Sequence, residues 1–320
     1  MRFERISSAG SLVTFFMIVL ARPCETTQPA AVKFTEEPGK VTVTIGKEHV
    51  AAYVYGDSAI GRPYFSNVRA PGGIQVTRNH PPIEGKDPTD HATMHPGIWM
   101  AFGDLSGGDY WRNKSKVVHD GFAQSPTGGS GKGVFAVRNG YAANGGEAAN
   151  CRETCRFTFS VRPFGFLLLW DSTFSSDQTD FYFGDQEEMG LGVRVATAIT
   201  EKAGGMIRNA DGLQGAKRVW GKSSAWCDYS GTIGGQHVGI TVMCDPANFR
   251  PSWFHARDYG LLVANPFGRK AFGQGDESKV YVKRDQAFRL RYGILLHSSA
   301  QQPTPDLKAA FADFLELLAK

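Results

Sequence analysis

Short runs in which apolar and polar residues alternate recur along most of the chain. Val41, Val43 and Ile45 alternate with two threonines, and this period of two predicts a half-buried β-strand. Residues 49–55 repeat the pattern and predict its hairpin partner. Further strands are predicted at residues 74–78, 98–102, 134–138, 157–161, 166–170, 193–199, 238–243 and 288–296. The run at 166–170 is apolar throughout, so we expect it to be buried on both faces.

A period of three and four residues appears only near the C-terminus. It predicts an amphipathic helix whose apolar stripe consists of Leu307, Ala310, Phe311, Phe314, Leu315 and Leu318. Thr304 is a candidate N-cap, and Pro305 suits the first turn. About a dozen strands without a repeat of fixed period predict an all-β protein, built as one large β-sandwich over residues 31–320.

Composition narrows the class further. Glycine accounts for 38 of 320 residues, roughly 12% against an average near 7%, which fits many tight turns. Residues 127–133, almost all Gly, Ser and Thr, predict a mobile surface loop. The formal charge of +4 is small and dispersed, so we expect no nucleic-acid partner.

The first 30 residues predict an export signal followed by a linker. Arg2 and Arg5 form a basic start, residues 12–21 form an apolar run, and Ala30-Ala31 offers a cleavage site. The polar linker continues to Gly39. We therefore expect a periplasmic or extracellular protein without a membrane span after cleavage.

Three alternatives remain open at this end of the chain. Cleavage can also fall near Ala21, and the apolar run can serve as a signal anchor. Cys24 allows a lipoprotein, although Pro23 departs from the small residue that lipidation requires.

Export makes the four remaining cysteines candidates for disulfides. Cys151, Cys155, Cys227 and Cys244 allow three pairings. Residues four apart on a continuous strand lie roughly 13 Å apart, beyond the roughly 7 Å limit for a bridge. A bridge between Cys151 and Cys155 therefore requires a turn. Four buried thiols are the alternative.

The stretch from Arg78 to Trp111 is rich in residues that can act in catalysis or binding. It contains three of the eight histidines, two of the six tryptophans and four of the sixteen prolines. Pro88 and Pro96 prevent a regular ladder between the strands predicted at 74–78 and 98–102. We therefore predict a loop that carries an active or binding site.

Asp90, His91 and His95 are the candidate catalytic groups in this loop. A carboxylate beside an imidazole can fix its tautomer and create a general acid or base. The same residues are a possible metal set. However, the spacing of His91 and His95 suits a helix, which Pro96 disfavours. In the structural alternative, the histidines only hydrogen-bond to backbone carbonyls.

Aromatic side chains near this loop are candidates for stacking on a sugar ring. Trp99 lies within a strand pattern, so we expect it in the core. Trp111 follows two glycines and an aspartate, so we expect it to be exposed.

Three later segments add candidate groups. Glu188 belongs to an acidic segment, residues 185–188, which can also be a charged turn. His255, Arg257 and Tyr259 alternate, so on a strand they face the same side. Asn265 precedes a proline in a turn. No motif of a serine hydrolase, a zinc protease, a phosphate-binding loop or a dinucleotide-binding unit occurs.

Several motifs together resemble the bacterial DUF6807 family, which is often labelled methane oxygenase PmoA. They cover most of residues 40–298 and are Arg62-Pro63-Tyr64-Phe65, Pro71-Gly72-Gly73, Asp90-His91, His95-Pro96-Gly97-Ile98-Trp99, Asp109-Tyr110-Trp111, Glu188 with Gly190 and Gly192-Val193-Arg194, Tyr259-Gly260, and Asn265-Pro266-Phe267-Gly268. The middle of the loop, Thr93-Met94 with Pro96, departs from the family's Asp-His-Pro-His-His-Arg-Gly type of run.

The resemblance implies a fold similar to the galactose-mutarotase-like supersandwich, in which sugar-active enzymes use histidines and acids on one sheet face. Because no stretch after the signal spans a membrane, a membrane copper oxygenase is disfavoured.

These observations predict an exported carbohydrate-active protein, a hydrolase or lyase that acts on a glycan or sugar derivative. We predict no cofactor. Asp90 with His91 or His95 is the predicted acid–base pair, and Glu188 the opposing carboxylate. The predicted substrate-binding residues are Arg78, Trp111, His255, Arg257, Tyr259 and Asn265. The alternatives are a non-catalytic glycan-binding module and a metal-dependent enzyme that uses His91 and His95. The decisive observation is whether His91, His95, Glu188, His255 and Arg257 meet in one cleft.

Overall fold

The structure is a computed structural model that describes residues 1, 3–4, 28–142, 149–300 and 305–319. The apolar run of the predicted export signal and Cys24 lie outside the described residues. The predicted polar linker is too long, because Ala31–Glu37 already forms the first strand, β1. Strand β1 pairs with β2 (Lys40–Ile45) across the Pro38-Gly39 turn, and this pairing provides hydrogen-bond partners for its backbone.

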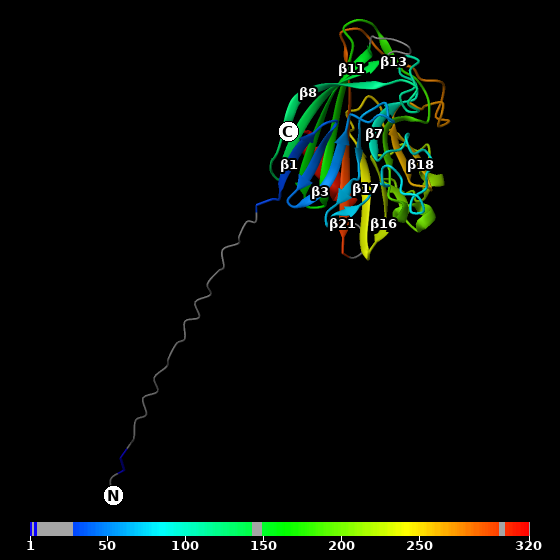
Figure 1. Cartoon of the computed structure of the whole chain (residues 1–320). Helices are drawn as coiled ribbons and strands as arrows, with labels where there is room; N and C mark the ends of the chain where they lie inside the picture. The colour runs from blue at the N-terminus through cyan, green and yellow to red at the C-terminus, as the bar shows by residue number, and fades with distance from the viewer. Residues whose placement is uncertain (2, 5–27, 143–148, 301–304, 320) are drawn as a thin grey trace.

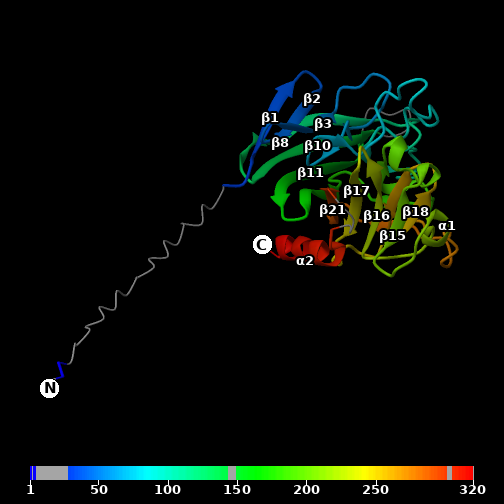
Figure 2. The ribbon, with the colours of Figure 1, turned by 90° about the horizontal axis from the view of Figure 1, so that it is seen from below.

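Within the described residues, two large antiparallel sheets form the body of the protein (Figures 1 and 2). In spatial order, the nine strands of the first sheet are β18 (Trp253–Arg257), β19 (Leu261–Asn265), β14 (Met189–Arg194), β7 (Ile98–Phe102), β4 (Tyr64–Ser66), β3 (Glu48–Val54), β2, β1 and β9 (Gly129–Ser130). The eight strands of the second are β15 (Met206–Asn209), β16 (Trp226–Ile233), β17 (Gln236–Cys244), β21 (Ala287–Ser299), β12 (Gly165–Ser175), β11 (Ala149–Arg162), β10 (Lys132–Ala142) and β8 (Val117–Thr127).

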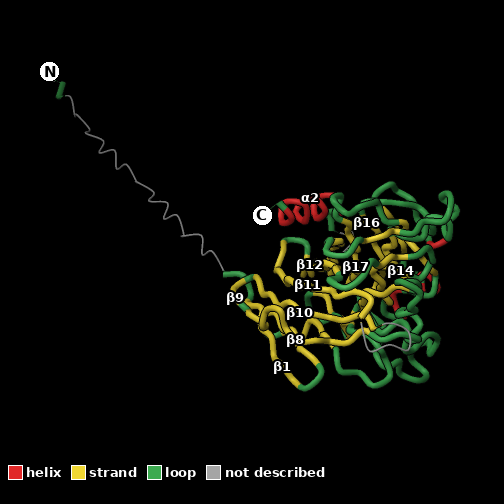
Figure 3. The backbone as a smooth tube through the Cα atoms, turned by 90° about the horizontal axis from the view of Figure 1, so that it is seen from above, coloured by secondary structure: helices red, strands yellow, loops and turns green. Residues whose placement is uncertain are grey.

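Smaller elements connect and cover the sheets. The described chain has two two-stranded sheets, β13 (Phe181–Phe183) with β20 (Val280–Val282) and β5 (Arg69–Ala70) with β6 (Ile74–Gln75). The helices are α1 (Ala216–Val219), α2 (Leu307–Leu318) and the 3-10 turns η1 (Thr197–Ile199) and η2 (Glu201–Ala203). Loops, green in Figure 3, gather on the side near β14, away from β1 and β9.

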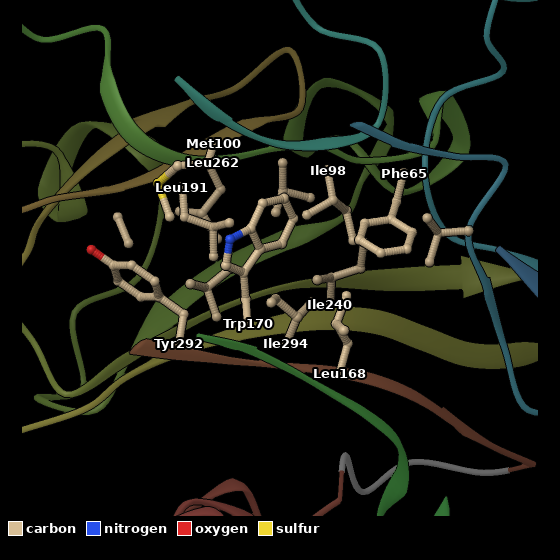
Figure 4. Close-up of a cluster of buried hydrophobic side chains, with 14 of the residues drawn as sticks. Phe65, Ile98, Met100, Leu168, Trp170, Leu191, Ile240, Leu262, Tyr292 and Ile294 are labelled. Atoms are coloured by element: carbon tan, nitrogen blue, oxygen red, sulfur yellow. The ribbon is translucent and has the colours of Figure 1, made fainter. Parts of the chain in front are cut away.

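The main core lies between the two large sheets. Figure 4 shows Phe65, Ile98 and Met100 from the first sheet facing Leu168, Trp170, Ile240 and Ile294 from the second. On β7, Ile98, Met100 and Phe102 enter this core, whereas Trp99 belongs to a separate cluster on the outer face of the sheet. Since successive strand residues point to opposite faces, one strand supplies both the core and the outer face.

Helix α2 covers the outer face of the second sheet, as Figure 2 shows. Phe314 is fully buried against this sheet, and Leu167 of β12 joins the same cluster. The apolar run at 166–170 is therefore covered on both faces, as predicted. The N-cap of α2 is Asp306, whose side chain accepts a 3.0 Å hydrogen bond from the backbone N–H of Ala309, rather than Thr304, which lies outside the described residues.

The all-β sandwich with a C-terminal helix is confirmed, but three local predictions are wrong. Residues 127–133 form a tight turn between β8 and β10, and β9 within it pairs with β1. The strand predicted at 74–78 is reduced to β6, and Thr77 makes only an isolated bridge with Val195. The strand predicted at 193–199 ends at Arg194 and gives way to η1. In each case, contacts with a segment distant in sequence determine the local structure, and the prediction from the local residue pattern fails.

Cys151, Cys155, Cys227 and Cys244 are buried free thiols, so the disulfide alternative is wrong for these four residues. Cys151 and Cys155 share strand β11, where the extended backbone keeps them apart. Among the described residues, no helix has the length and apolar character needed to cross a membrane.

Candidate functional site

The predicted loop joins β6 to β7, and Arg78 lies beneath it. The guanidinium group of Arg78 donates hydrogen bonds to the carbonyls of Asp90 (2.7 Å), Pro88 (2.9 Å) and His95 (3.1 Å). Its side chain is 1% exposed. Burial lowers the pKa of Arg78 to about 10, so the group stays charged at neutral pH. Arg78 therefore shapes the loop from below and does not reach the pocket, contrary to its predicted role in substrate binding.

A second contact fixes the loop to η1. Asp87 accepts hydrogen bonds from the Asn79 amide at 2.8 Å, the Ile83 backbone N–H at 3.0 Å and the Thr197 hydroxyl at 2.7 Å. The loop ends at Gly97, the residue before β7. A Cβ atom at this position would clash with the carbonyl oxygen of Phe65. Some of the polar residues in this stretch, such as Asp87, thus hold the loop in place and do not line a site.

Four nearly parallel rings run from the loop into the outer face of the first sheet. The ring centroids are 6.2 Å apart for Tyr259 and His91, 4.8 Å for His91 and His95, and 5.2 Å for His95 and Trp99. The interplanar angles are 14°, 21° and 13°. The two histidines are therefore held face to face, and His91 is the more accessible of the pair, with a side chain 42% exposed.

Asp90 orients His91. The Nδ1 atom of His91 lies 2.9 Å from Oδ2 of Asp90, and Arg194 donates to Oδ1 of Asp90 at 2.9 Å. Burial alone would raise the pKa of Asp90, but the hydrogen bonds with His91 and Arg194 outweigh it and lower this pKa to about 2. Asp90 is thus a fixed anion. His91 has a φ of 51°, a costly backbone conformation that is more common at functional sites than elsewhere.

His95 has a different character from His91. It is 3% exposed, and its Nδ1 atom lies 3.5 Å from Nη1 of Arg194. Burial, reinforced by the charge of Arg194, lowers the pKa of His95 to about 2. The ring is therefore neutral at physiological pH and cannot act as a cationic acid.

Glu188 approaches the loop from the start of β14. Arg112 donates to Oε2 of Glu188 at 2.7 Å and to Oδ2 of Asp109 at 3.1 Å. The side chains of Arg112 and Glu188 are 33% and 34% exposed. The pair therefore offers both a guanidinium and a carboxylate to a ligand.

His255 and Arg257 lie on the same face of β18, as predicted. Arg257 donates from Nε to Nε2 of His255 at 2.8 Å and from Nη2 to Oε2 of Glu187 at 2.9 Å. Burial, followed by the charge of Arg257, lowers the pKa of His255 to about 4. Neutral His255 thus positions Arg257. Tyr259 follows in the turn after the strand, where burial raises its pKa, so the phenol keeps its proton.

These groups meet in one pocket of about 150 Å³, named the histidine pocket below. Its lining residues are His91, Met94, His95, Trp111, Arg112, Glu188, His255, Arg257, Tyr259 and Leu261. The five residues whose convergence was the decisive observation are all among them. Asp90 stands behind His91.

Besides Arg78, a second predicted site residue lies outside the pocket, and a third lines it in an unexpected environment. Asn265 is fully buried and donates to the carbonyls of Gln186 (2.8 Å) and Glu187 (3.0 Å), so it holds the acidic segment instead of lining the pocket. Trp111 lines the pocket but is 1% exposed, so the prediction of an exposed ring is wrong. It packs edge-to-face on Trp99, because Gly192 beneath them has no side chain.

Met94, Arg112 and Leu261 line the pocket but were not predicted from the sequence as site residues. Arg194 was not predicted either; it is buried and lies over the Tyr259 ring at 4.5 Å. An arginine that ends an otherwise apolar strand was the available signal for Arg194. In the described parts of the chain, no group of three or more His, Cys, Asp or Glu residues is arranged to hold a metal ion.

The histidine pocket lies within a segment that matches a known protein family. The model of the family of unknown function DUF6807 matches residues 40–310. The chain belongs to this family. The match includes every residue of the histidine pocket. No curated protein matches the chain.

Solved structures with a similar arrangement include carbohydrate-related proteins. A putative kojibiose phosphorylase from the human microbiome has a TM-score of 0.38 at 8% identity, and a heparan sulfate lyase HepC mutant from Pedobacter heparinus has 0.38 at 6%. They cover 92% and 87% of this chain, which spans only 36% of each. A galactose mutarotase-like protein from Lactobacillus casei has 0.35 at 9% identity, covering 83% of this chain and 100% of its own.

Proposed function

We propose that this DUF6807 protein is an exported carbohydrate-active enzyme, a hydrolase or lyase that uses His91 as its proton-transfer group. One observation carries the proposal. The 2.9 Å contact between Asp90 and His91 lies at the wall of a pocket that also contains Glu188, Arg257 and Tyr259. A histidine fixed by a carboxylate and open to a pocket is a common arrangement for general acid–base chemistry.

The contact with Asp90 defines which nitrogen of His91 can react. Nδ1 faces the Asp90 carboxylate, whereas Nε2 makes no hydrogen bond to a described residue. When Nδ1 carries the proton, Nε2 presents its lone pair and can take a proton from a substrate. The anionic Asp90 then stabilises the imidazolium that forms. His95 supports the ring of His91 from behind by stacking.

Glu188 is the proposed second proton-transfer group. Arg112 holds its carboxylate at the pocket wall with a 2.7 Å hydrogen bond. A hydrolase needs one group to protonate the leaving oxygen and one to activate water or attack the sugar. A lyase needs a base for the C–H next to a uronate carboxylate and a positive group to stabilise the resulting charge. Arg112 and Arg257 can supply that charge.

A sugar fits the chemistry of this pocket. The phenol of Tyr259 and the guanidinium of Arg257 can donate hydrogen bonds to hydroxyl groups or bind a carboxylate. The ring faces of Tyr259 and His91 can contact the C–H groups of a sugar ring. The N-terminal sequence pattern supports export, which would give the protein access to extracellular glycans.

The test is a turnover screen against purified glycans with matched histidine variants. The panel includes neutral and uronate-containing oligosaccharides, with reducing ends measured for either reaction and ultraviolet absorbance for unsaturated lyase products. His91→Ala is expected to lower kcat by about 10²- to 10⁴-fold, the usual contribution of general acid–base catalysis. His49→Ala, which changes a histidine outside the pocket, is expected to leave kcat unchanged.

Two results would contradict the proposal. Turnover that is equal in the wild type and His91→Ala would remove His91 as the proton-transfer group. Glycan binding without turnover would instead indicate a non-catalytic binding module.

A further inference from the structure

A second and larger pocket lies beside the histidine pocket. It measures about 700 Å³ and is named the α1 pocket here. Its walls come from η2, α1, the end of β18 and the following turn, and its lining residues are Glu187, Glu201, Lys202, Ala216, Lys217, Trp220, Ala256, Arg257 and Asp258. Pockets that bind small molecules usually measure about 300–1,000 Å³, so the α1 pocket is within this range and the histidine pocket is below it.

The two pockets share a wall. Arg257 lines both, and neighbouring acids divide between them, with Glu187 in the α1 pocket and Glu188 in the histidine pocket. The ion pair between Arg257 and Glu187, at 2.9 Å, lies at this boundary. Both side chains are partly exposed, at 41% and 30%. A ligand that occupies one pocket is therefore within reach of the other.

The α1 pocket combines an aromatic ring with balanced charges. Trp220 has its ring 5.9 Å from the guanidinium carbon of Arg257 and is braced edge-to-face by Phe272. The lining contains three cationic side chains and three carboxylates, which include an exposed pair of Lys202 and Asp258 at 3.5 Å. The lining therefore offers both hydrogen-bond donors and hydrogen-bond acceptors, and its charges sum to zero. Hydroxyl groups of an uncharged sugar satisfy both kinds of partner, and an indole face suits the C–H groups of its ring.

We propose that the α1 pocket binds a neutral sugar unit adjacent to the unit in the histidine pocket, so that the ligand is an oligosaccharide lying across the Arg257–Glu187 ion pair. This inference rests on the proposed function and names the form of its substrate. The histidine pocket holds the reacting unit, and the α1 pocket supplies binding energy from its neighbour. Binding energy remote from the reacting bond can also position that bond, so a shorter substrate is expected to lose rate as well as affinity.

The experiment measures affinity against chain length by calorimetry. The probes are gluco-, manno-, xylo- and galacturono-oligosaccharides of one to six units, together with a mixed disaccharide of one uronate and one neutral sugar. For the full-length wild type, affinity for a recognised series is expected to rise about tenfold from one unit to two. Trp220→Ala is expected to remove this rise, because aromatic stacking contributes roughly three- to tenfold per ring. Its affinity for the single unit is expected to stay unchanged.

Control variants separate binding from folding. Trp220→Phe keeps an aromatic ring and is expected to keep most of the rise with length. Tyr281→Ala removes a ring that is 62% exposed and outside both pockets, and it is expected to behave as the wild type. If Trp220→Ala does not fold, Lys217→Ala, which removes a hydrogen-bond donor from the α1 pocket, provides the second measurement. It is expected to reduce the rise in affinity from one neutral unit to two, and an unchanged rise would overturn the inference.

Failure of this inference differs from failure of the proposed function. A wild type that binds two units no better than one, while His91→Ala still abolishes turnover, would overturn only the α1 subsite. The same holds for a length dependence that Trp220→Ala leaves intact. A wild type that binds no series would overturn both proposals.

Discussion

The imidazole rings of His91 and His95 are stacked 4.8 Å apart, yet they have opposite environments. The side chain of His91 is 42% exposed and contacts an aspartate, whereas His95 is 3% exposed and lies against an arginine. A single loop thus presents one histidine to the pocket and keeps its neighbour neutral as a support. The two histidines should respond differently to substitution.

Removal of the Asp90 charge should impair catalysis. Asp90→Asn keeps the size of the side chain but removes the anion that orients His91 and pairs with Arg194. We expect kcat to fall roughly 10- to 100-fold, less than for loss of the histidine itself. Steady-state kinetics on a substrate from the glycan screen checks this. Asp177→Asn changes an exposed control carboxylate that lies 3.7 Å from Arg152, and it should leave kcat unchanged. Equal activity of both variants would contradict the role of Asp90.

Acidification should destabilise the fold through His95. Its pKa is about 2 in the folded protein, against about 6.5 in an unfolded chain. Between these values the unfolded chain binds more protons, so stability rises with pH up to about 6.5 and falls as the pH is lowered. From pH 7 to pH 5 this group should account for a loss of about 2 kcal/mol.

Urea unfolding at pH 7 and pH 5 provides the measurement for His95. His95→Phe keeps a ring between His91 and Trp99, and its stability should decrease less on acidification than that of the wild type. A variant with the same pH dependence as the wild type would show that His95 is not the group responsible.

Helix α2 should contribute strongly to stability through Phe314. This ring is fully buried against the second sheet, directly over Gly293, where an added side chain would lie 2.8 Å from it. Phe314→Ala should lower the free energy of unfolding by about 3–5 kcal/mol, as for other buried aromatic residues. Phe311→Ala, at a partly exposed position on the same helix, should cost clearly less. Equal losses in chemical denaturation would mean that α2 is not packed as described.

The four buried cysteines should resist alkylation in the native protein. Burial raises the pKa of Cys151, Cys155, Cys227 and Cys244, and the thiolate is the reactive form. Peptide mapping after iodoacetamide treatment should find all four unmodified in the native state and modified after unfolding. A peptide joined by a disulfide would contradict the assignment of free thiols.

The sequence was most informative where a local pattern agrees with the tertiary contacts. Residues 98–102 were predicted as a strand and form β7 with the same bounds, because their five apolar residues are covered on both faces. The loop after Arg78 was also predicted, because proline and polar residues exclude a ladder there. The sequence suggested a site because polar and titratable residues cluster in this loop. That His91, Glu188 and His255 line the same pocket could be seen only in the structure.

The sequence is least informative where contacts with residues far along the chain determine the environment of a side chain. The neutral state of His95 depends on its burial, reinforced by Arg194, which is 99 positions away. The placement of Glu188 depends on Arg112, 76 positions away. Neither pair leaves a local pattern. Trp111 was expected at the surface because of the glycines before it. The decisive glycine was Gly192 on another strand, where an added Cβ would lie 2.6 Å from the Trp99 ring.

The alternation along β7 has a consequence for how this protein can change. Ile98 and Met100 enter the core while Trp99, between them, supports the histidine stack from the opposite side. Insertion or deletion of one residue in this strand would exchange the two faces and destroy the core and the site together. New specificity is therefore accessible through substitution of the loop before β7 and of the segments around α1, while the strand beneath them must keep its length.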